Sequence, residues 1–143
     1  VVVVDVLQRD QSPAVRIEAV RAIGRVSNSF IYADTLRQRL NPAVEPNVRV
    51  QEETWAALMQ LMKLASREQL KEWPDHFRED AARRADVLGV LVALNEQAGN
   101  RDDLLDSLFA LAETQLFLRR YGEAIESIGR ALPLAEDARL LRT

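Results

Sequence analysis

Apolar residues recur along this chain at three- and four-residue steps, which is the spacing of one face of an α-helix. The pattern continues with short interruptions from one end to the other. The first ten residues are ambiguous, because the four consecutive valines favour extended structure while Val1, Val4 and Leu7 also fit one helix face. The predicted helices span residues 13–28, 29–40, 47–65, 67–73, 81–98, 102–119, 121–132 and 135–141.

The apolar stripe of each predicted helix indicates which residues face the core. The residues at this spacing are Val15, Ala19, Ala22, Ile23 and Val26; Phe30, Ala33, Leu36 and Leu40; Val48, Glu52, Trp55, Leu58, Met59 and Met62; Ala81, Ala85, Leu88, Leu91, Val92 and Ala98; Leu104, Leu105, Leu108, Leu111, Ala112 and Leu116. Nearly every predicted helix therefore needs a neighbour against which to bury its apolar side.

Local signals set several helix ends. Ser66 followed by Gln69 has the spacing of a capping box, in which each side chain satisfies a free backbone amide of the other residue. Pro74 is expected to halt the short helix before it, and Gly99 to end the long helix before it with a left-handed residue. Pro133 is expected to interrupt the last helical stretch.

Short loops between consecutive helices force those helices to run antiparallel. A stack of helical hairpins would satisfy this connectivity and cover the apolar stripes. We therefore expect an all-α fold, a right-handed α-α superhelix, or solenoid, of HEAT, armadillo or tetratricopeptide type. Its expected parts are residues 1–74 and residues 75–143 in one continuous stack.

Two segments that lie 33 residues apart look alike. Both Ser12–Arg16 and Glu45–Arg49 carry a proline followed two residues later by Val-Arg, just before a helix rich in alanine. This pattern resembles the start of the second helix of a HEAT repeat, and Asp10 with Arg16 fits the ladder between repeats of that family. The resemblance covers about residues 1–66. In the second copy Ala43 replaces the ladder's Asp and Trp55 a small residue, which implies less regular packing.

The C-terminal half resembles a tetratricopeptide repeat over residues 103–134. The resemblance rests on Leu108, Leu111, Ala112, Tyr121, Ala124, Ile128 and Ala131. It implies that Ala112 and Ala124 let two helices approach closely and that Ala131 receives a following repeat. Leu108 and Gln115 depart from the family, which often has Trp and Tyr there, and Pro133 comes earlier than its usual terminal proline.

Composition narrows the function classes. The chain has 143 residues, a net charge of −3 and well-mixed acidic and basic positions. That balance argues against a dedicated nucleic-acid binder, which needs a basic stripe. The chain contains no cysteine, which excludes disulfides and thiolate zinc sites and suits a reducing compartment, so a cytoplasmic location is favoured.

Hydropathy and the chain's first residues add two expectations. No apolar run approaches the roughly 20 residues that cross a bilayer, so no membrane partner is expected. The chain begins without Met on the apolar run Val1–Val4, so we read it as a piece of a longer protein whose first ten residues are the tail of a truncated helix.

No catalytic, cofactor or metal constellation is evident. His76 is the only histidine, and the acidic pairs Glu52-Glu53 and Asp102-Asp103 are adjacent, so on a helix their side chains point about 100° apart rather than converging. The five glycines never cluster into a phosphate-binding loop. We therefore expect no enzyme and no cofactor.

The fold class favours a protein-binding scaffold, since stacked helical pairs offer extended surfaces for protein or peptide partners. The candidate partner-binding residues are Arg16, Arg49, Trp55 and Arg84. A structural spacer within a larger protein, and self-association through uncapped solenoid ends, remain alternatives. The least favoured is a HEAT-like enzyme, such as the DNA glycosylases and bilin lyases of that class, in which a cleft carries Trp, Asp and Arg.

Overall fold

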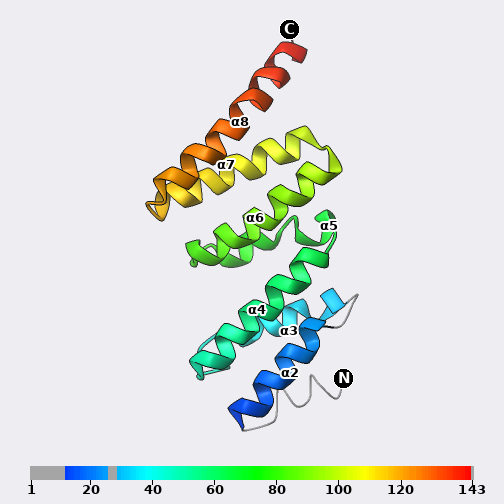
Figure 1. Ribbon diagram of the computed structural model, residues 1–143, viewed down its shortest axis with the longest axis vertical. Helices are drawn as coiled ribbons and strands as arrows, with labels where there is room; N and C mark the ends of the chain where they lie inside the picture. Colours follow the sequence, from blue (N-terminus) through cyan, green and yellow to red (C-terminus); the bar gives the residue numbers. More distant parts are fainter. Residues whose placement is uncertain (1–11, 26–28, 143) are drawn as a thin grey trace. The chain divides into compact units, whose positions relative to one another are not determined.

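The computed structural model describes residues 12–25 and 29–142, and every regular element in this part of the chain is helical (Figure 1). The expected all-α class is thereby confirmed. The elements are α2 (Pro13–Arg25), η1 (Ser29–Tyr32), α3 (Ala33–Arg39), α4 (Val48–Leu64), α5 (Arg67–Leu70), η2 (Trp73–Phe77), α6 (Ala81–Ala98), α7 (Arg101–Phe117) and α8 (Tyr121–Arg142), where η marks a 3₁₀ turn. The expected helix tail over residues 1–10, the ladder residue Asp10 and the apolar Val26 lie outside the described residues.

The chain forms two compact units, Val1–Ala65 and Ser66–Thr143. The division falls between α4 and the Ser66 cap of α5. The expected boundary after residue 74 lies inside the second unit, within η2.

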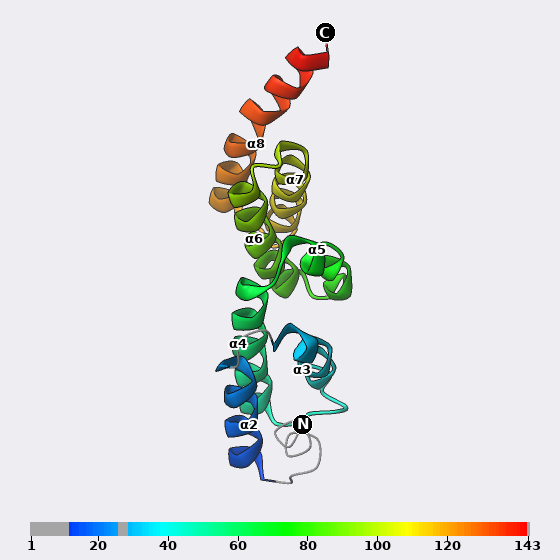
Figure 2. The same ribbon diagram turned by 90° about the vertical axis from the view of Figure 1, so that its right-hand side faces the viewer.

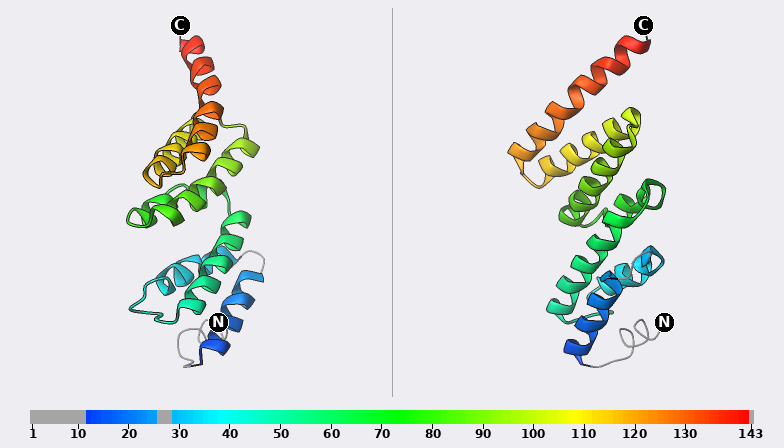
Figure 3. Two further views of the ribbon diagram at one scale, coloured as in Figure 1. Left: turned by 60° about the vertical axis from the view of Figure 1, so that its left-hand side comes forward. Right: turned by 45° about the vertical axis from the view of Figure 1, so that its right-hand side comes forward.

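In the first unit α4 packs against both α2 and α3. Arg21 bonds to Glu53, 32 residues later, and Gly24 meets Ala57, 33 residues later. An offset that stays nearly constant along both helices means that α2 and α4 run parallel, as Figures 1 and 3 show. Their separation along the chain matches the 33-residue offset of the two similar sequence segments.

Gly24 permits the close approach of these two helices. A Cβ atom at this buried position would lie 3.1 Å from the Cβ of Ala57 and 3.2 Å from its Cα. Two small residues thus bring the helix backbones together, and the large side chains pack on either side. The residues buried around them are Ile17, Ala19, Val20, Ile23, Ala33, Leu36, Leu40, Val50, Thr54, Leu58, Leu61, Met62 and Ala65.

This packing leaves part of the predicted apolar stripes of α2 and α4 exposed. Val15 and Val48 are 41% and 67% exposed, and Glu52 is also exposed. Val15 and Val48 lie 33 residues apart, so the two similar sequence segments expose the same valine. Helix periodicity alone allowed a face that contains them, but the contact at Gly24 selects the face of Val20 and Val50 instead.

In the second unit α7 packs against both α6 and α8 (Figures 1 and 2). Asn95 of α6 donates to Ser107, and Arg84 of α6 donates to Thr114, so contacts run in opposite directions along the two helices. The chain therefore reverses direction from α6 to α7 and again from α7 to α8. The core cluster of this unit consists of Ala85, Leu88, Val92, Leu108, Leu111 and Ala131.

Three residues of the second unit differ from expectation. Ala131 is fully buried in the cluster with residues of α6 and α7, so it receives preceding helices rather than a following repeat. Leu116, expected inside, is 47% exposed, and Ala98 is exposed as well. Ala112 and Ala124 are buried as expected.

Most helix ends follow the predicted signals. Ser66 and Gln69 form the complete capping box, and Gly99 ends α6 in the left-handed conformation with φ of 69°. The side chains of Asn47 and Asn100 accept amide N–H groups at the starts of α4 and α7. Short polar residues before α4, α5 and α7 therefore satisfy donors that these helices leave unpaired.

Two prolines do not end helices. Helix α5 already stops at Leu70, and Pro74 lies in the first turn of η2, where its missing N–H costs nothing. Pro133 lies inside α8, which continues to Arg142. Pro133 and Gly129, whose carbonyl would pair with it, are both exposed, so water can satisfy that carbonyl.

No helix in the described part of the chain is both long and apolar enough to span a membrane.

The close contact at Gly24 predicts opposite effects of one substitution at two glycines. Gly24→Leu should lower the free energy of unfolding by about 1–3 kcal/mol, since α4 blocks the new side chain. Gly89→Leu, at an exposed position of α6 with open space around it, should raise that free energy by roughly 0.5–1 kcal/mol through helix propensity. Chemical denaturation measures both, and equal effects would contradict the proposed role of Gly24.

Candidate functional site

The parallel helices of the first unit leave a groove along their outer side. It has a volume of about 250 Å³ and is lined by Arg21, Arg25, Glu53, Ala56, Ala57 and Gln60. We call it the α2–α4 groove. It exists because Gly24 and Ala57 are small where the helices meet, while longer polar side chains stand at both edges.

The acidic group of this groove is already neutralised. Arg21 donates to both oxygens of Glu53, at 3.2 Å and 2.8 Å, and to Glu18 at 3.1 Å. The hydrogen bond from Arg21, together with the charges of Arg21 and Arg49, holds the pKa of Glu53 below its ordinary value. The same hydrogen bond and charge raise the pKa of Arg21.

Arg25 is the cation of the groove that has no ion pair within the described part of the chain. It is exposed at the last turn of α2, and Gln60 is exposed across from it on α4. Arg49 lies one turn before Glu53 on α4 and is exposed too. The groove therefore offers guanidinium and amide groups over a floor of small side chains, which suits carboxylate and peptide groups.

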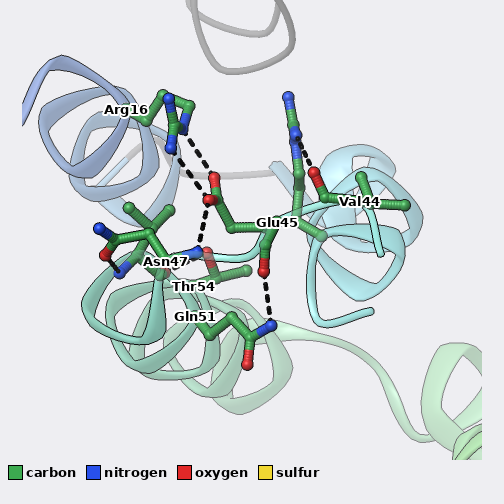
Figure 4. A network of polar contacts seen from close by, with 8 residues as sticks. Arg16, Val44, Glu45, Asn47, Gln51 and Thr54 are labelled. Carbon is green, nitrogen blue, oxygen red and sulfur yellow. Dashed lines mark hydrogen bonds and ion pairs between the residues drawn. The ribbon is translucent and has the colours of Figure 1, made fainter. Parts of the chain in front are cut away.

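A buried carboxylate organises the loop that leads into α4 (Figure 4). Glu45 is fully buried, and Arg16 of α2 donates to its two oxygens from Nε at 2.7 Å and Nη2 at 3.0 Å. The backbone N–H of Asn47 donates to the same carboxylate at 3.2 Å. Gln51 in turn donates to the Glu45 carbonyl at 2.6 Å, and Arg39 donates to the Val44 carbonyl at 3.3 Å.

Burial by itself would raise the pKa of Glu45. The hydrogen bonds from Arg16 and the Asn47 amide, with the charges of Arg16 and Arg39, outweigh burial and hold that pKa below its ordinary value. Burial is the main cause that lowers the pKa of Arg39, opposed by the charge of Glu45. Glu45 therefore stays ionised at neutral pH and holds α2 against the start of α4.

The four predicted partner-binding residues are not brought together. Arg16 is only 12% exposed in its side chain because it pairs with Glu45. Arg49 is exposed beside the groove, whereas Trp55 is half-buried on another face of α4. Arg84 belongs to the second unit, where it donates to Thr114 at 3.3 Å and to the Arg78 carbonyl at 3.1 Å. Their role in binding stays a prediction.

Sequence reasoning missed both the groove and the role of Glu45. The residues that line the groove are ordinary surface residues when each helix is read alone. The 33-residue offset between the similar segments was the available signal, because applied to Gly24 it leads directly to Ala57. No comparable signal pointed from Glu45 to Arg16, since their pairing depends on how the loop folds.

Within the residues that the structure describes, no group of three or more His, Asp or Glu side chains is placed to hold a metal ion. His76 is exposed in η2, with its ring 5.2 Å from the ring of the buried Trp73 in an edge-on arrangement. It belongs to a local aromatic contact.

Comparison with protein-family models, with curated proteins and with solved structures found no significant match to this chain. The resemblances to HEAT and tetratricopeptide repeats therefore stay predictions.

The pairing of Arg16 predicts that its loss affects folding. Arg16→Ala should lower the free energy of unfolding by about 3 kcal/mol, because it leaves the buried Glu45 without its countercharge. Arg49→Ala, at an exposed position of the same unit, should change it by less than about 0.5 kcal/mol. Urea denaturation at neutral pH measures both values. Similar values for the two variants would show that the pair does not hold α2 in place.

The lowered pKa of Glu45 also predicts how stability depends on pH. A carboxyl group with a lowered pKa stabilises the fold above the pKa of the unfolded chain, about 4.3 for Glu, and loses this contribution as pH falls through the folded value. The difference in unfolding free energy between the wild type and Glu45→Gln should be constant near neutrality and shrink below about pH 4. A difference that persists unchanged into strong acid would rule out the ionised pair as its cause.

Proposed function

We propose that this chain is a non-catalytic protein-interaction scaffold built from stacked helical repeats, and that the α2–α4 groove holds part of its partner. The observation that carries the proposal is the parallel stacking of α2 on α4 at an offset of 32–33 residues, with a groove along the junction. Repeated helices that stack in the same direction offer extended surfaces for protein partners.

A similar spacing within the second unit supports the repeat architecture. Glu96 of α6 and Arg130 of α8 form an ion pair at 2.7 Å across an offset of 34 residues, and α6 and α8 run in the same direction. Helical hairpins that repeat at this spacing are the units of a solenoid. A right-handed α-α superhelix, HEAT-like in the first unit and tetratricopeptide-like in the second, is part of this proposal.

The chemistry of the groove favours a peptide segment that carries carboxylates. Arg25 can bind a carboxylate through two parallel hydrogen bonds, and Gln60 can both donate to and accept from a peptide backbone. Ala56 and Ala57 leave room for a backbone to approach. Arg49 extends the positive charge along α4 toward the N-terminus of that helix.

A structural spacer is the second candidate. Arg16 and Arg84, two of the residues expected to meet a partner, use their guanidinium groups for contacts inside their own units. A chain that serves only to separate other domains needs such internal contacts and no groove.

Affinity capture from the source cells separates the two candidates. The wild type should retain a partner that Arg25→Glu/Arg49→Glu loses, because both substitutions replace exposed cations at or beside the groove. Lys71→Glu/Arg78→Glu is the matched control, with the same change of charge at exposed positions of the second unit. All three proteins should show the same helicity by circular dichroism.

Partner retention by all three proteins would exclude the groove as the binding site. Failure of every bait to retain a partner would favour the spacer.

A further inference from the structure

Large apolar side chains remain uncovered on one side of the second unit. Tyr121, Ile125 and Leu132 of α8 are 58%, 70% and 52% exposed, and Phe109 and Leu116 of α7 are 44% and 47% exposed. The partly buried Leu105 and Ile128 lie on the same stripes. We call these seven residues the α7–α8 apolar face.

Helix geometry places the α7 half of this face away from α6. Residues advance around a helix by about 100° each. On α7, Ser107 and Thr114 bond to α6, and Gln115 bonds to Ser127 of α8. Going around the circumference of α7 from the side that faces α6, one passes Gln115 on the side that faces α8. The apolar residues Leu105, Phe109 and Leu116 lie beyond it.

The α8 half follows the same order. Arg130 faces α6 through its ion pair with Glu96, and Ser127 faces α7. Going around the circumference of α8 from the side that faces α6, one passes from Arg130 to Ser127. The apolar residues that lie beyond them are Ile128, Tyr121, Leu132 and Ile125. Because α7 and α8 are antiparallel neighbours, both stripes open on the side opposite α6 and form one continuous apolar surface that extends the α7–α8 contact.

Carboxylates border this surface on both helices. Asp102, Asp106 and Glu113 follow the stripe on α7, and Glu136 follows it on α8; all four are exposed. None takes part in an ion pair within the described residues. Three nearby cations form ion pairs, and all three bond to other acids: Arg101 of α7, Arg120 in the turn after α7, and Arg130 of α8. The borders of the face are therefore acidic.

We propose that the α7–α8 apolar face binds an amphipathic helix of a partner protein whose apolar side is bordered by Lys or Arg. A helix laid along two antiparallel helices buries an apolar side of matching spacing, and basic flanks complement the two acidic borders. A second copy of this chain would instead bring acidic borders against each other, which like-charge repulsion disfavours.

This inference rests on the proposed function, since it names the class of partner for a protein-binding chain, but it does not depend on the α2–α4 groove. A failure here with a partner still bound through Arg25 and Arg49 would leave the proposed function standing.

The test uses two synthetic helical peptides of about 18 residues, or five turns. Both carry leucine at helical spacing on one side, and their other positions are Lys in one peptide and Glu in the other. Fluorescence anisotropy with the 143-residue chain should show that the Lys peptide binds at least about tenfold more tightly, a difference of about 1.4 kcal/mol. High salt should reduce the difference, because exposed charges are screened.

Matched variants locate the binding. Ile125→Ser should weaken binding of the Lys peptide about tenfold, whereas Leu64→Ser, equally exposed on α4 at 71%, should leave it unchanged. Asp106→Lys/Glu113→Lys should shift preference toward the Glu peptide. Circular dichroism should show unchanged helicity in all variants.

Several outcomes would overturn the proposal. These are binding of neither peptide, equal binding of both, and an unchanged affinity in Ile125→Ser. Sedimentation that shows self-association of the wild type, lost in Ile125→Ser, would assign the face to a second copy and overturn it as well.

Discussion

The first unit depends on one buried carboxylate. Glu45 lies in the loop before α4, and its ion pair with Arg16 attaches that loop to α2. A buried charge is costly unless it is paired and hydrogen-bonded, so the loop, the start of α4 and the side of α2 must all keep their places. That constraint sets the parallel packing in which Gly24 meets Ala57, and the groove follows from the packing.

The helices could be predicted because each carries its own local signals. Apolar periodicity located α2, α4, α6 and α7, and Ser66, Gln69 and Gly99 marked ends that the structure confirms. The exposure of Val48, in the first turn of α4, could not be predicted in this way, because the apolar periodicity fits more than one face of the helix. The contact with a neighbouring helix selects among them.

The candidate site was harder to predict because it depends on pairs of helices. Arg16 looks like a surface cation until the loop brings Glu45 beneath it, and Arg25 is unremarkable until α4 places Gln60 across from it. In the second unit Leu116 fits the inward stripe of α7 by spacing alone. It is nevertheless 47% exposed, because the core of this unit is built around Leu108, Leu111 and Ala131 instead.

The central claim is that stacking of α2 on α4 creates a partner-binding groove. Site-specific photo-crosslinking inside source cells tests it most directly, with benzoyl-phenylalanine replacing Ala56 in the groove or Ile31 at an exposed position of η1. The account predicts that one protein partner crosslinks to position 56 and none to position 31. Equal crosslinking at both positions, or none at position 56, would contradict it.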